Sequence, residues 1–363
     1  MNWYLITSNL LSIRSNYTIN KGKTMIITTA IRLPNPERLM VTWDTGRRCN
    51  FDCTYCEATR HDNKSAPHSY EELVRTFEFV KKYTGEQLVN INFTGGEPTV
   101  NPAFWQLAEY IHTNETRFRL SLTTNGAWHP KNTDRIAKWF EGVTVSYHAE
   151  GHAILKKQTM DNIKLLHDLG IWLQVNVMMH VDHFDECKQI CAELKELGIK
   201  HNPRPIGDGG IDRKGWFIDS DGSHRRTSHD YNDEQTKWYF EYLGITSPKE
   251  GRNCCGGRCV QGKVNDKWQD VNFIDTNFKG WACSVNKYFL HIDQHTGNVY
   301  HHQTCQALHD GRRGVLGNLN NTDDIFAYVQ ANKDKTIICP NNRCGCGMCI
   351  PKAKSIDAFK ELL

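Results

Sequence analysis

Between residues 38 and 206, short apolar runs alternate with amphipathic stretches, and this alternation limits the possible fold more than any other feature of the chain. Several of the runs are apolar on both faces, as buried parallel strands are. We expect strands at residues 39–44, 89–94, 118–124, 143–147, 171–178 and 199–205.

Amphipathic helices are predicted between these strands. Ser69 and Glu72 form a capping-box pattern, and an apolar stripe at one-face spacing follows until Gly85. Similar stripes predict helices near residues 160–169 and 184–194. Cys187 and Cys191 fall on the last stripe, so we expect them in the core. Six strand–helix repeats favour an α/β fold with a partial (βα)6 barrel over a complete eight-fold barrel.

The composition changes after residue 206, and this change divides the chain. Residues 1–37 are expected to form an N-terminal extension, with Met25 as an alternative start, and residues 38–206 the partial barrel. A polar linker with one helix near residues 233–243 is expected at 207–250. A smaller cysteine-rich domain at 251–350 and a C-terminal helix at 351–363 complete the expected division.

Fourteen cysteines are unusual in a chain of 363 residues. The chain is large and shows no secretory signal, so we expect a cytoplasmic protein whose clustered, reduced cysteines bind metal. The apolar patch at residues 5–11 is too short and too polar for a membrane span. The net charge of +3 gives no reason to expect a membrane or a long polynucleotide as partner.

Three of the cysteines, Cys49, Cys53 and Cys56, lie within eight residues directly after the first expected strand. A closed zinc or iron–sulfur site needs four ligands, but no fourth cysteine or evident histidine completes this set locally, since His61 has no supporting motif. Three thiolates would instead leave one iron of a 4Fe–4S cluster open to another ligand. A zinc site on a loop and ordinary thiols are the alternatives.

The Cys-x-x-x-Cys-x-x-Cys spacing, with the aromatic Tyr55 before the third cysteine, resembles the cluster loop of the radical S-adenosylmethionine (SAM) superfamily. The resemblance implies that these cysteines hold three irons and that SAM binds the fourth through its amino and carboxylate groups. It also implies reductive cleavage of SAM to a 5′-deoxyadenosyl radical that abstracts hydrogen from a substrate.

Two further motifs agree with this resemblance. Thr94-Gly-Gly-Glu-Pro98 ends the second expected strand, where its glycines permit close approach of a ligand and its carboxylate can accept from an ammonium. Thr123-Thr-Asn-Gly126 ends the third; a plain Asn-Gly turn is the alternative there. The implied SAM-binding residues are Tyr55, Gly95, Gly96, Glu97, Pro98, Thr124, Asn125, Ser146 and Asn176.

Ser146 and Asn176 are included because they lie on later strands whose carboxyl ends would line the site. For both, a satisfied buried polar residue is the alternative. His148 is a candidate to face the substrate, with a structural role as its alternative. Arg204 and Pro205 would border the adenine by family analogy alone.

The C-terminal cysteines resemble the auxiliary-cluster extensions called SPASM and twitch domains. Cys283, a predicted hairpin with Gly297 in its turn, and a later cysteine run fit these extensions, but His302 stands where the family places a cysteine. One auxiliary iron–sulfur cluster is expected and two are the alternative, as is a structural zinc. Its expected ligands are Cys283, Cys305, Cys339, Cys344, Cys346 and Cys349.

Some roles in this region stay open between residues. His301 or His302 are further candidate ligands. A second cluster would draw on Cys254, Cys255 and Cys259. One of these three, or Cys305, would alternatively be a thiol that donates hydrogen to a substrate radical.

The sequence therefore predicts a radical SAM oxidoreductase, isomerase or transferase that oxidises, epimerises or cross-links a small molecule, sugar or peptide. A flavodoxin or ferredoxin would supply the electron. Residues 1–37 are short for a peptide-recognition domain, which weakens the peptide alternative. Modification of a nucleoside or nucleic acid is the second hypothesis, kept open by the pairs Arg225-Arg226 and Arg312-Arg313. A non-catalytic iron–sulfur or zinc scaffold is the third.

Overall fold

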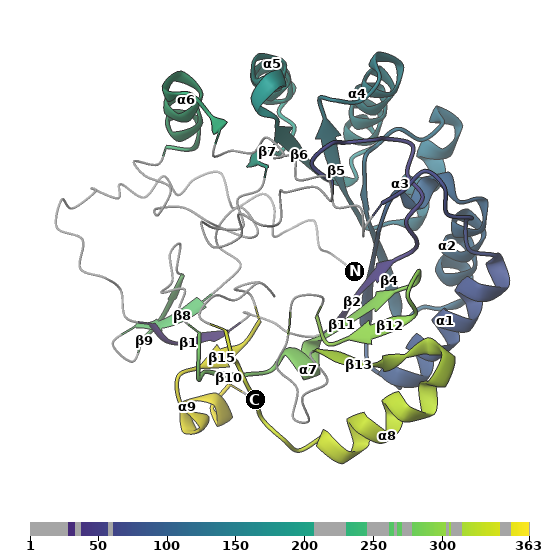
Figure 1. Ribbon diagram of the computed structural model, residues 1–363, viewed down its shortest axis with the longest axis vertical. Coiled ribbons are helices and arrows are strands. Elements are labelled where there is room, and N and C mark those ends of the chain that lie inside the picture. Colours follow the sequence, from purple (N-terminus) through teal and green to yellow (C-terminus); the bar gives the residue numbers. More distant parts are fainter. Residues whose placement is uncertain are drawn as a thin grey trace, which may run out of the picture.

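A computed structural model of the protein describes residues 28–32, 38–56, 61–206, 230–244, 261–264, 267–270, 278–302, 305, 314–341 and 350–362. Its main feature is a curved sheet with the strand order β13-β12-β11-β2-β3-β4-β5-β6-β7 (Figure 1). Strands β2 to β7 run parallel to their neighbours. Their bounds are Leu39–Asp44, Val89–Thr94, Phe118–Thr124, Gly142–His148, Trp172–Met179 and His201–Pro205.

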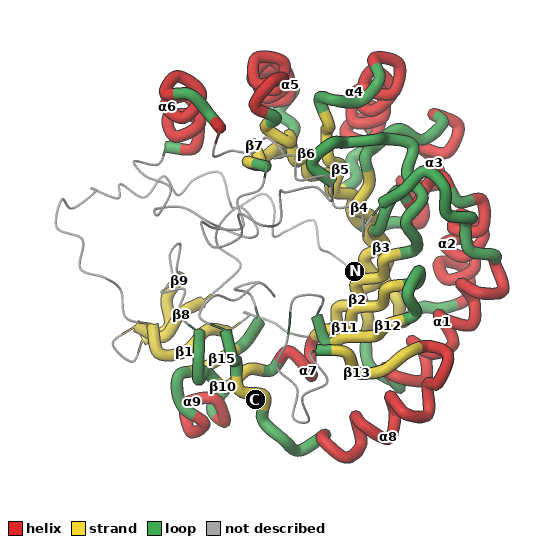
Figure 2. The backbone as a smooth tube through the Cα atoms, viewed as in Figure 1, coloured by secondary structure: helices red, strands yellow, loops and turns green. Residues whose placement is uncertain are grey.

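Each of these six strands is followed by a helix, as a partial (βα)6 barrel requires. The helices α1 to α6 span Tyr70–Thr84, Pro102–Asn114, Thr133–Trp139, Ala153–Asp168, Phe184–Glu196 and Asp233–Leu243. Figure 2 shows them along the outer side of the curved sheet. Short 3-10 helices lie at Pro98–Val100, Pro130–Asn132, Val181–His183 and Leu319–Asn321. The expected α/β fold class and partial barrel are confirmed.

Alternation along each strand gives the sheet an apolar and a polar face. In β2, Leu39, Val41 and Trp43 are buried while the residues between them are half-buried. The buried residues join one core with the inner stripes of the helices. The polar residues of β2 to β7 face the inside of the curve, where a ligand would meet them.

Local signals at the helix ends act as the sequence predicts. The Ser69 side chain accepts from the Glu72 N–H at 3.2 Å, and the Glu72 carboxylate accepts from the Ser69 N–H at 2.7 Å, so the capping box is complete. Cys187 and Cys191 are fully buried in the core. Their assignment to packing is confirmed.

The C-terminal region adds strands to the barrel sheet. β11 (Phe289–Asp293) pairs parallel with β2, and β12 (Asn298–Tyr300) and β13 (Val315–Asn318) follow it in antiparallel pairs. The expected hairpin is therefore present, but it continues the barrel instead of standing in a separate unit. Helices α7 (Val285–Tyr288) and α8 (Thr322–Asn332) flank these strands.

A second sheet joins both ends of the described chain, in the order β14-β10-β15-β1-β8-β9. β1 (Thr28–Arg32) pairs with β15 (Lys352–Ala353), so part of the expected N-terminal extension is a strand. The remaining strands are β8 (Gln261–Val264), β9 (Lys267–Asp270), β10 (Ala282–Cys283) and β14 (Ile337–Ile338). The expected C-terminal helix is short, as α9 (Ile356–Lys360).

Among the helices that the structure describes, none has the length and apolar character needed to cross a bilayer.

Candidate active site at the carboxyl edge of the sheet

The loop after β2 brings Cys49, Cys53 and Cys56 into one small apolar cluster. Phe51, Ala127, Tyr55 and Leu155 complete this cluster. The loop turns tightly, because the Cys56 N–H donates to the Cys53 carbonyl at 3.0 Å, and the Phe51 N–H donates to the Cys49 sulfur at 3.4 Å. The three cysteines expected to act together therefore lie together.

Burial makes free thiolates unfavourable in this cluster. It raises the pKa of both Cys49 and Cys53 to about 12, and the neighbouring thiols add to the effect. A bound metal cation would stabilise the thiolates and so lower these pKa values, because the thiolate is the form that binds metal. In the described part of the chain, no three His, Cys, Asp or Glu side chains are arranged around a single metal ion. Cysteines that hold an iron–sulfur cluster each bind a different iron, so they need not converge on one point. Three thiols on one short loop fit a cluster that takes one cysteine on each of three irons.

Gly95 and Gly96 are required by the backbone beside them. A Cβ on Gly96 would lie 2.3 Å from the Arg47 carbonyl oxygen, and one on Gly95 would lie 2.6 Å from the Gly46 carbonyl oxygen. The Gly96 N–H donates to Gly46 and the Glu97 N–H to Arg48, both at 2.8 Å. The sequence predicted close approach of a ligand; in the structure the approaching group is the start of the cysteine loop.

Glu97 is buried and joins the ends of β3 and β4. Its carboxylate accepts from the Thr99 N–H and hydroxyl, from the Thr124 hydroxyl at 2.8 Å and from the Asn125 N–H at 2.7 Å. Burial raises the pKa of this carboxyl, while the same hydrogen bonds oppose the rise. Pro98 begins the 3-10 helix that Glu97 caps. Glu97 therefore has a structural role in addition to the expected role toward an ammonium.

Asn125 connects the end of β4 to the cysteine loop. Its amide NH2 donates to the Asn50 side-chain oxygen at 2.6 Å and lies 3.9 Å from the Cys49 sulfur. Its own side-chain oxygen accepts from the Ala127 N–H at 2.9 Å, which fixes the orientation of the amide. The sequence singled out Asn125 for SAM, and the structure also gives it the task of holding the Cys49 end of the loop.

Tyr55 packs between two histidines. Its hydroxyl hydrogen-bonds with Nδ1 of His148, and its ring lies 5.9 Å from the His148 ring and 5.8 Å from the His180 ring, centroid to centroid. Burial lowers the pKa of His148 to about 4, so the imidazole is neutral near pH 7. His148 thus faces the cysteine loop, which agrees with its position at the end of β5.

Ser146 and Asn176 lie side by side on β5 and β6, in register and half-buried. The Asn176 side-chain oxygen accepts from Gln174 at 3.3 Å and from Arg204 at 3.5 Å. They belong to the same polar face as His148, and Pro205 ends the next strand, β7. The structure brings these predicted residues to one face, although no ligand role for them follows from their contacts.

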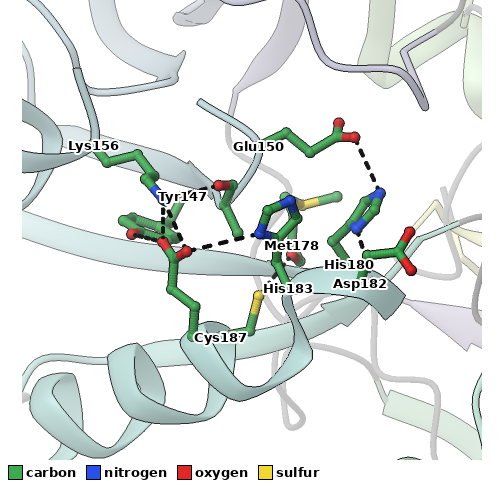
Figure 3. A network of polar contacts seen from close by, with 10 residues as sticks. Tyr147, Glu150, Lys156, Met178, His180, Asp182, His183 and Cys187 are labelled. Carbon is green, nitrogen blue, oxygen red and sulfur yellow. Dashed lines mark hydrogen bonds and ion pairs between the residues drawn. The ribbon is translucent and has the colours of Figure 1, made fainter. Parts of the chain in front are cut away.

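Glu150, Thr54 and His180 contact one another beside the cysteine loop, and the sequence did not predict a role for any of them. Glu150, in the turn after β5, accepts from the Thr54 N–H at 2.9 Å and from the Thr54 hydroxyl at 2.7 Å. Its carboxylate also lies 3.2 Å from Nε2 of His180 (Figure 3). Burial raises the pKa of Glu150, but the bonds from His180 and Thr54 outweigh it and keep the pKa below its ordinary value. The Ala-Glu-Gly sequence at 149–151 carries no motif that would have indicated this contact.

His61 lies against the same loop. Its Nε2 is 3.5 Å from an Asp52 carboxylate oxygen, and neither ring nitrogen has a hydrogen-bond partner although both are buried. The adjacent Asp62 carbonyl accepts from the Cys49 N–H at 3.2 Å. A buried imidazole without hydrogen bonds is costly, so His61 is a candidate to contact a bound group.

The C-terminal cysteines that the structure describes also gather in one region. Cys283 and Cys305 are buried with Val285, Ile337 and Ile350. The Cys339 N–H donates to the carbonyl of Trp281 at 2.8 Å, two residues before Cys283. His301, four residues before Cys305, is buried. Burial lowers the pKa of the next residue, His302, to about 4. The other candidates lie outside the described residues: Cys254, Cys255, Cys259, Cys344, Cys346 and Cys349.

Residues 43–201 match the sequence profile of the radical SAM superfamily. Among curated proteins, the chain is 23% identical over 211 residues to the antilisterial bacteriocin subtilosin biosynthesis protein AlbA of Bacillus subtilis, covering 54% of this chain and 46% of AlbA. It is 34% identical over 97 residues to GTP 3′,8-cyclase of Pasteurella multocida, covering 26% of this chain and 28% of the cyclase. The chain thus spans less than half the length of either relative.

Two solved structures have partial similarity to this chain. Streptococcus suis SuiB bound to S-adenosylmethionine has a TM-score of 0.49 at 13% identity, covering 86% of this chain and 71% of SuiB. The enzyme anSMEcpe with bound AdoMet and the Cp18Cys peptide has a TM-score of 0.49 at 14% identity, covering 80% of each chain.

Proposed function

Because residues 43–201 of this chain belong to the radical SAM superfamily, we propose that the protein is a radical SAM enzyme that holds its site cluster through Cys49, Cys53 and Cys56. The observation that carries the proposal is the gathering of these three thiols, Cys53 buried and the other two half-buried, beside the ends of β3, β4 and β5. A 4Fe–4S cluster with SAM bound there would supply a 5′-deoxyadenosyl radical able to abstract hydrogen from a substrate.

The residues around the thiols would prepare this site in distinct ways. Phe51 and Leu155 pack in the same apolar cluster as the thiols, and Asn125 fixes the Cys49 end of the loop through Asn50. The neutral His148 holds the Tyr55 hydroxyl. Gly95 to Pro98, Thr124, Ser146 and Asn176 stand along the same edge, where the SAM amino, carboxylate and ribose groups would meet polar partners.

We also propose one auxiliary iron–sulfur cluster at Cys283, Cys305 and Cys339, with further ligands from the cysteine run at 344–349. The burial of Cys283 and Cys305 in one apolar cluster supports this site. Since iron–sulfur cysteines must stay reduced before assembly, we place the protein in the cytoplasm. A flavodoxin or ferredoxin would deliver the single electron.

For the substrate, we propose a peptide or protein. The 211-residue match to AlbA, whose name assigns it to the biosynthesis of a bacteriocin, supports this class. The 97-residue match to GTP 3′,8-cyclase supports a nucleotide as the second candidate. Addition of GTP to the reduced enzyme with SAM tests the nucleotide: a rise in 5′-deoxyadenosine would favour it over a peptide.

The central test uses protein purified and reconstituted without oxygen. About four irons per chain are expected for each 4Fe–4S cluster, and dithionite with SAM should yield 5′-deoxyadenosine. Cys53→Ala should abolish that product and lose only the site-cluster iron. If both the iron content and the product survive in Cys53→Ala, the proposed site is wrong.

A further inference from the structure

In the segment between Cys53 and Cys56, one carboxylate holds Thr54, while the next residue, Tyr55, is hydrogen-bonded to His148. One oxygen of Glu150 accepts from the Thr54 backbone N–H at 2.9 Å and the other accepts from the Thr54 hydroxyl at 2.7 Å. Thr54 is itself exposed and lies directly after Cys53. A bidentate acceptor of this kind fixes both the position and the orientation of the residue it binds.

Glu150 is in turn fixed from its other side by His180, at the end of β6. His180 is 5% exposed, and its Nε2 lies 3.2 Å from the Glu150 carboxylate. Its Nδ1 accepts from the Asp182 N–H at 3.2 Å, which leaves Nε2 as the ring nitrogen that donates to Glu150. Figure 3 shows this chain of contacts from Asp182 through His180 to Glu150.

The two ends of the cysteine loop therefore have different supports. The Cys49 end is held through Asn50 and Asn125, from β4. The Cys53 end is held through Thr54 and Glu150, from the turn between β5 and α4. A loop held at both ends presents its thiols in one arrangement, which a rigid cluster requires.

A neighbouring polar network differs in this respect. Glu186 accepts from the Tyr147 hydroxyl at 2.7 Å and from Lys156 at 2.8 Å. These contacts join β5, α4 and α5, and none of them reaches residues 49–56. Figure 3 shows Tyr147 and Lys156, which donate them. Glu186 is thus a matched acidic residue that stabilises the same part of the fold without contacting the loop.

We propose that Glu150 is a positioning residue that fixes Cys53 and Cys56 against the β5–β6 edge of the site, so that a cluster bound there has one geometry. The inference rests on the proposed function, since it concerns the cluster held by these cysteines. It predicts that loss of the Glu150 carboxylate alters the iron retention and the spectrum of the cluster in a protein that is still folded.

The test compares anaerobically reconstituted wild type with Glu150→Ala, Glu150→Gln and the control Glu186→Gln. The rate of iron release to a chelator is measured, together with the electron paramagnetic resonance spectrum of the reduced protein with and without SAM. In Glu150→Ala, the SAM-responsive cluster should lose its iron roughly tenfold faster, since both charge-assisted bonds to Thr54 are gone. Its spectrum with SAM should become heterogeneous.

Glu150→Gln should lie between wild type and Glu150→Ala, because its single amide oxygen still accepts from Thr54. Glu186→Gln should match wild type in both measurements. If Glu150→Ala fails to fold, Thr54→Val replaces it, because this exposed substitution removes the hydroxyl bond alone and should speed iron release to a smaller extent.

The outcomes separate the inference from the proposed function. A wild type without a SAM-responsive cluster would overturn the proposed function. A wild type with such a cluster, and Glu150→Ala and Thr54→Val with unchanged release rates and spectra, would overturn the role of Glu150. If Glu150→Gln and Glu186→Gln changed the iron-release rate and the spectrum equally, Glu150 would be only a general stabilising residue. This result would also overturn its proposed positioning role.

Discussion

Gly96→Ala should separate the backbone role of the glycine pair from a role in ligand binding. The added Cβ would lie 2.3 Å from the Arg47 carbonyl oxygen and 2.4 Å from the Arg48 carbonyl oxygen, so the backbone must shift. Overpacking of this kind costs about 1–3 kcal/mol. The shift also strains the two hydrogen bonds donated by the Gly96 and Glu97 N–H groups, at about 1 kcal/mol each.

The free energy of unfolding should therefore fall by about 3–5 kcal/mol in the metal-free protein, where no ligand is bound. Gly170→Ala is the control, because its Cβ would meet nothing within 4 Å and only its positive φ of 71° opposes the substitution. That strain costs about 1–2 kcal/mol. Denaturant unfolding followed by tryptophan fluorescence, with iron content after reconstitution, measures both variants.

Gly96→Ala should also retain less iron than Gly170→Ala, because the loop that it displaces carries Cys49. If the free energy of unfolding of metal-free Gly96→Ala lies within about 1 kcal/mol of the wild-type value, the backbone contact is unimportant for stability. The glycine would then be needed for the ligand alone.

Three further predictions concern the buried groups and the first helix. Burial lowers the pKa of His148 from its ordinary value of 6.5 to about 4 in the folded protein, so its contribution to stability is complete above pH 6.5 and is lost as the pH falls toward 4. In thermal unfolding of the metal-free protein, the melting temperature should fall less between pH 7 and 5 in His148→Gln than in wild type; an equal pH dependence would argue against a neutral imidazole at this position. Cys191→Ser should destabilise the fold by about 1–3 kcal/mol without changing the iron content, because it buries a hydroxyl in the apolar core; loss of iron would instead make Cys191 a ligand. Ser69→Ala should cost about 1 kcal/mol by removing one half of the capping box, and denaturant unfolding that matched wild type would show that the cap is not needed.

The barrel was predictable because its signals are local and repeated. The expected bounds of β2, β3 and β4 coincide with those observed, since each apolar run ends at a turn or at a motif. The three-cysteine loop was equally predictable, because its cysteines are close in sequence. The sequence patterns did not predict helices α2 and α3, although Asn101 before Pro102 is a recognisable signal for the start of α2.

The contacts between distant segments were not predictable from the sequence. Glu150 reaches Thr54 across 96 positions, and no spacing rule links them. The pairing of β1 with β15 joins opposite ends of the chain, where neither strand is long enough to show a period. Such contacts depend on how distant segments are arranged in the fold, and the periodicity of a single sequence does not contain this information.

The position of β11 makes the barrel depend on the C-terminal region. Without β11, β2 would be the edge of the parallel sheet, and its unpaired backbone groups would precede the cysteine loop directly. The same contact buries a hydrogen bond of 3.1 Å from the Trp43 indole to Gln294, and the Gln294 N–H donates to the Asp44 carbonyl at 2.9 Å.

A chain that ends at residue 250 keeps all six βα units but loses these partners of β2. In such a fragment, Trp43 and the edge of the sheet become exposed together. We therefore expect it to aggregate on expression, or to bind less than half of the roughly four irons per chain that one complete site cluster contains. Soluble yield, size-exclusion chromatography and iron analysis measure this. The comparison is the full chain carrying Cys283→Ala, which removes a proposed auxiliary-cluster ligand and leaves β11 in place. A soluble fragment with a complete site cluster would mean that β11 merely covers the barrel, and that the first 250 residues contain everything the cysteine loop needs.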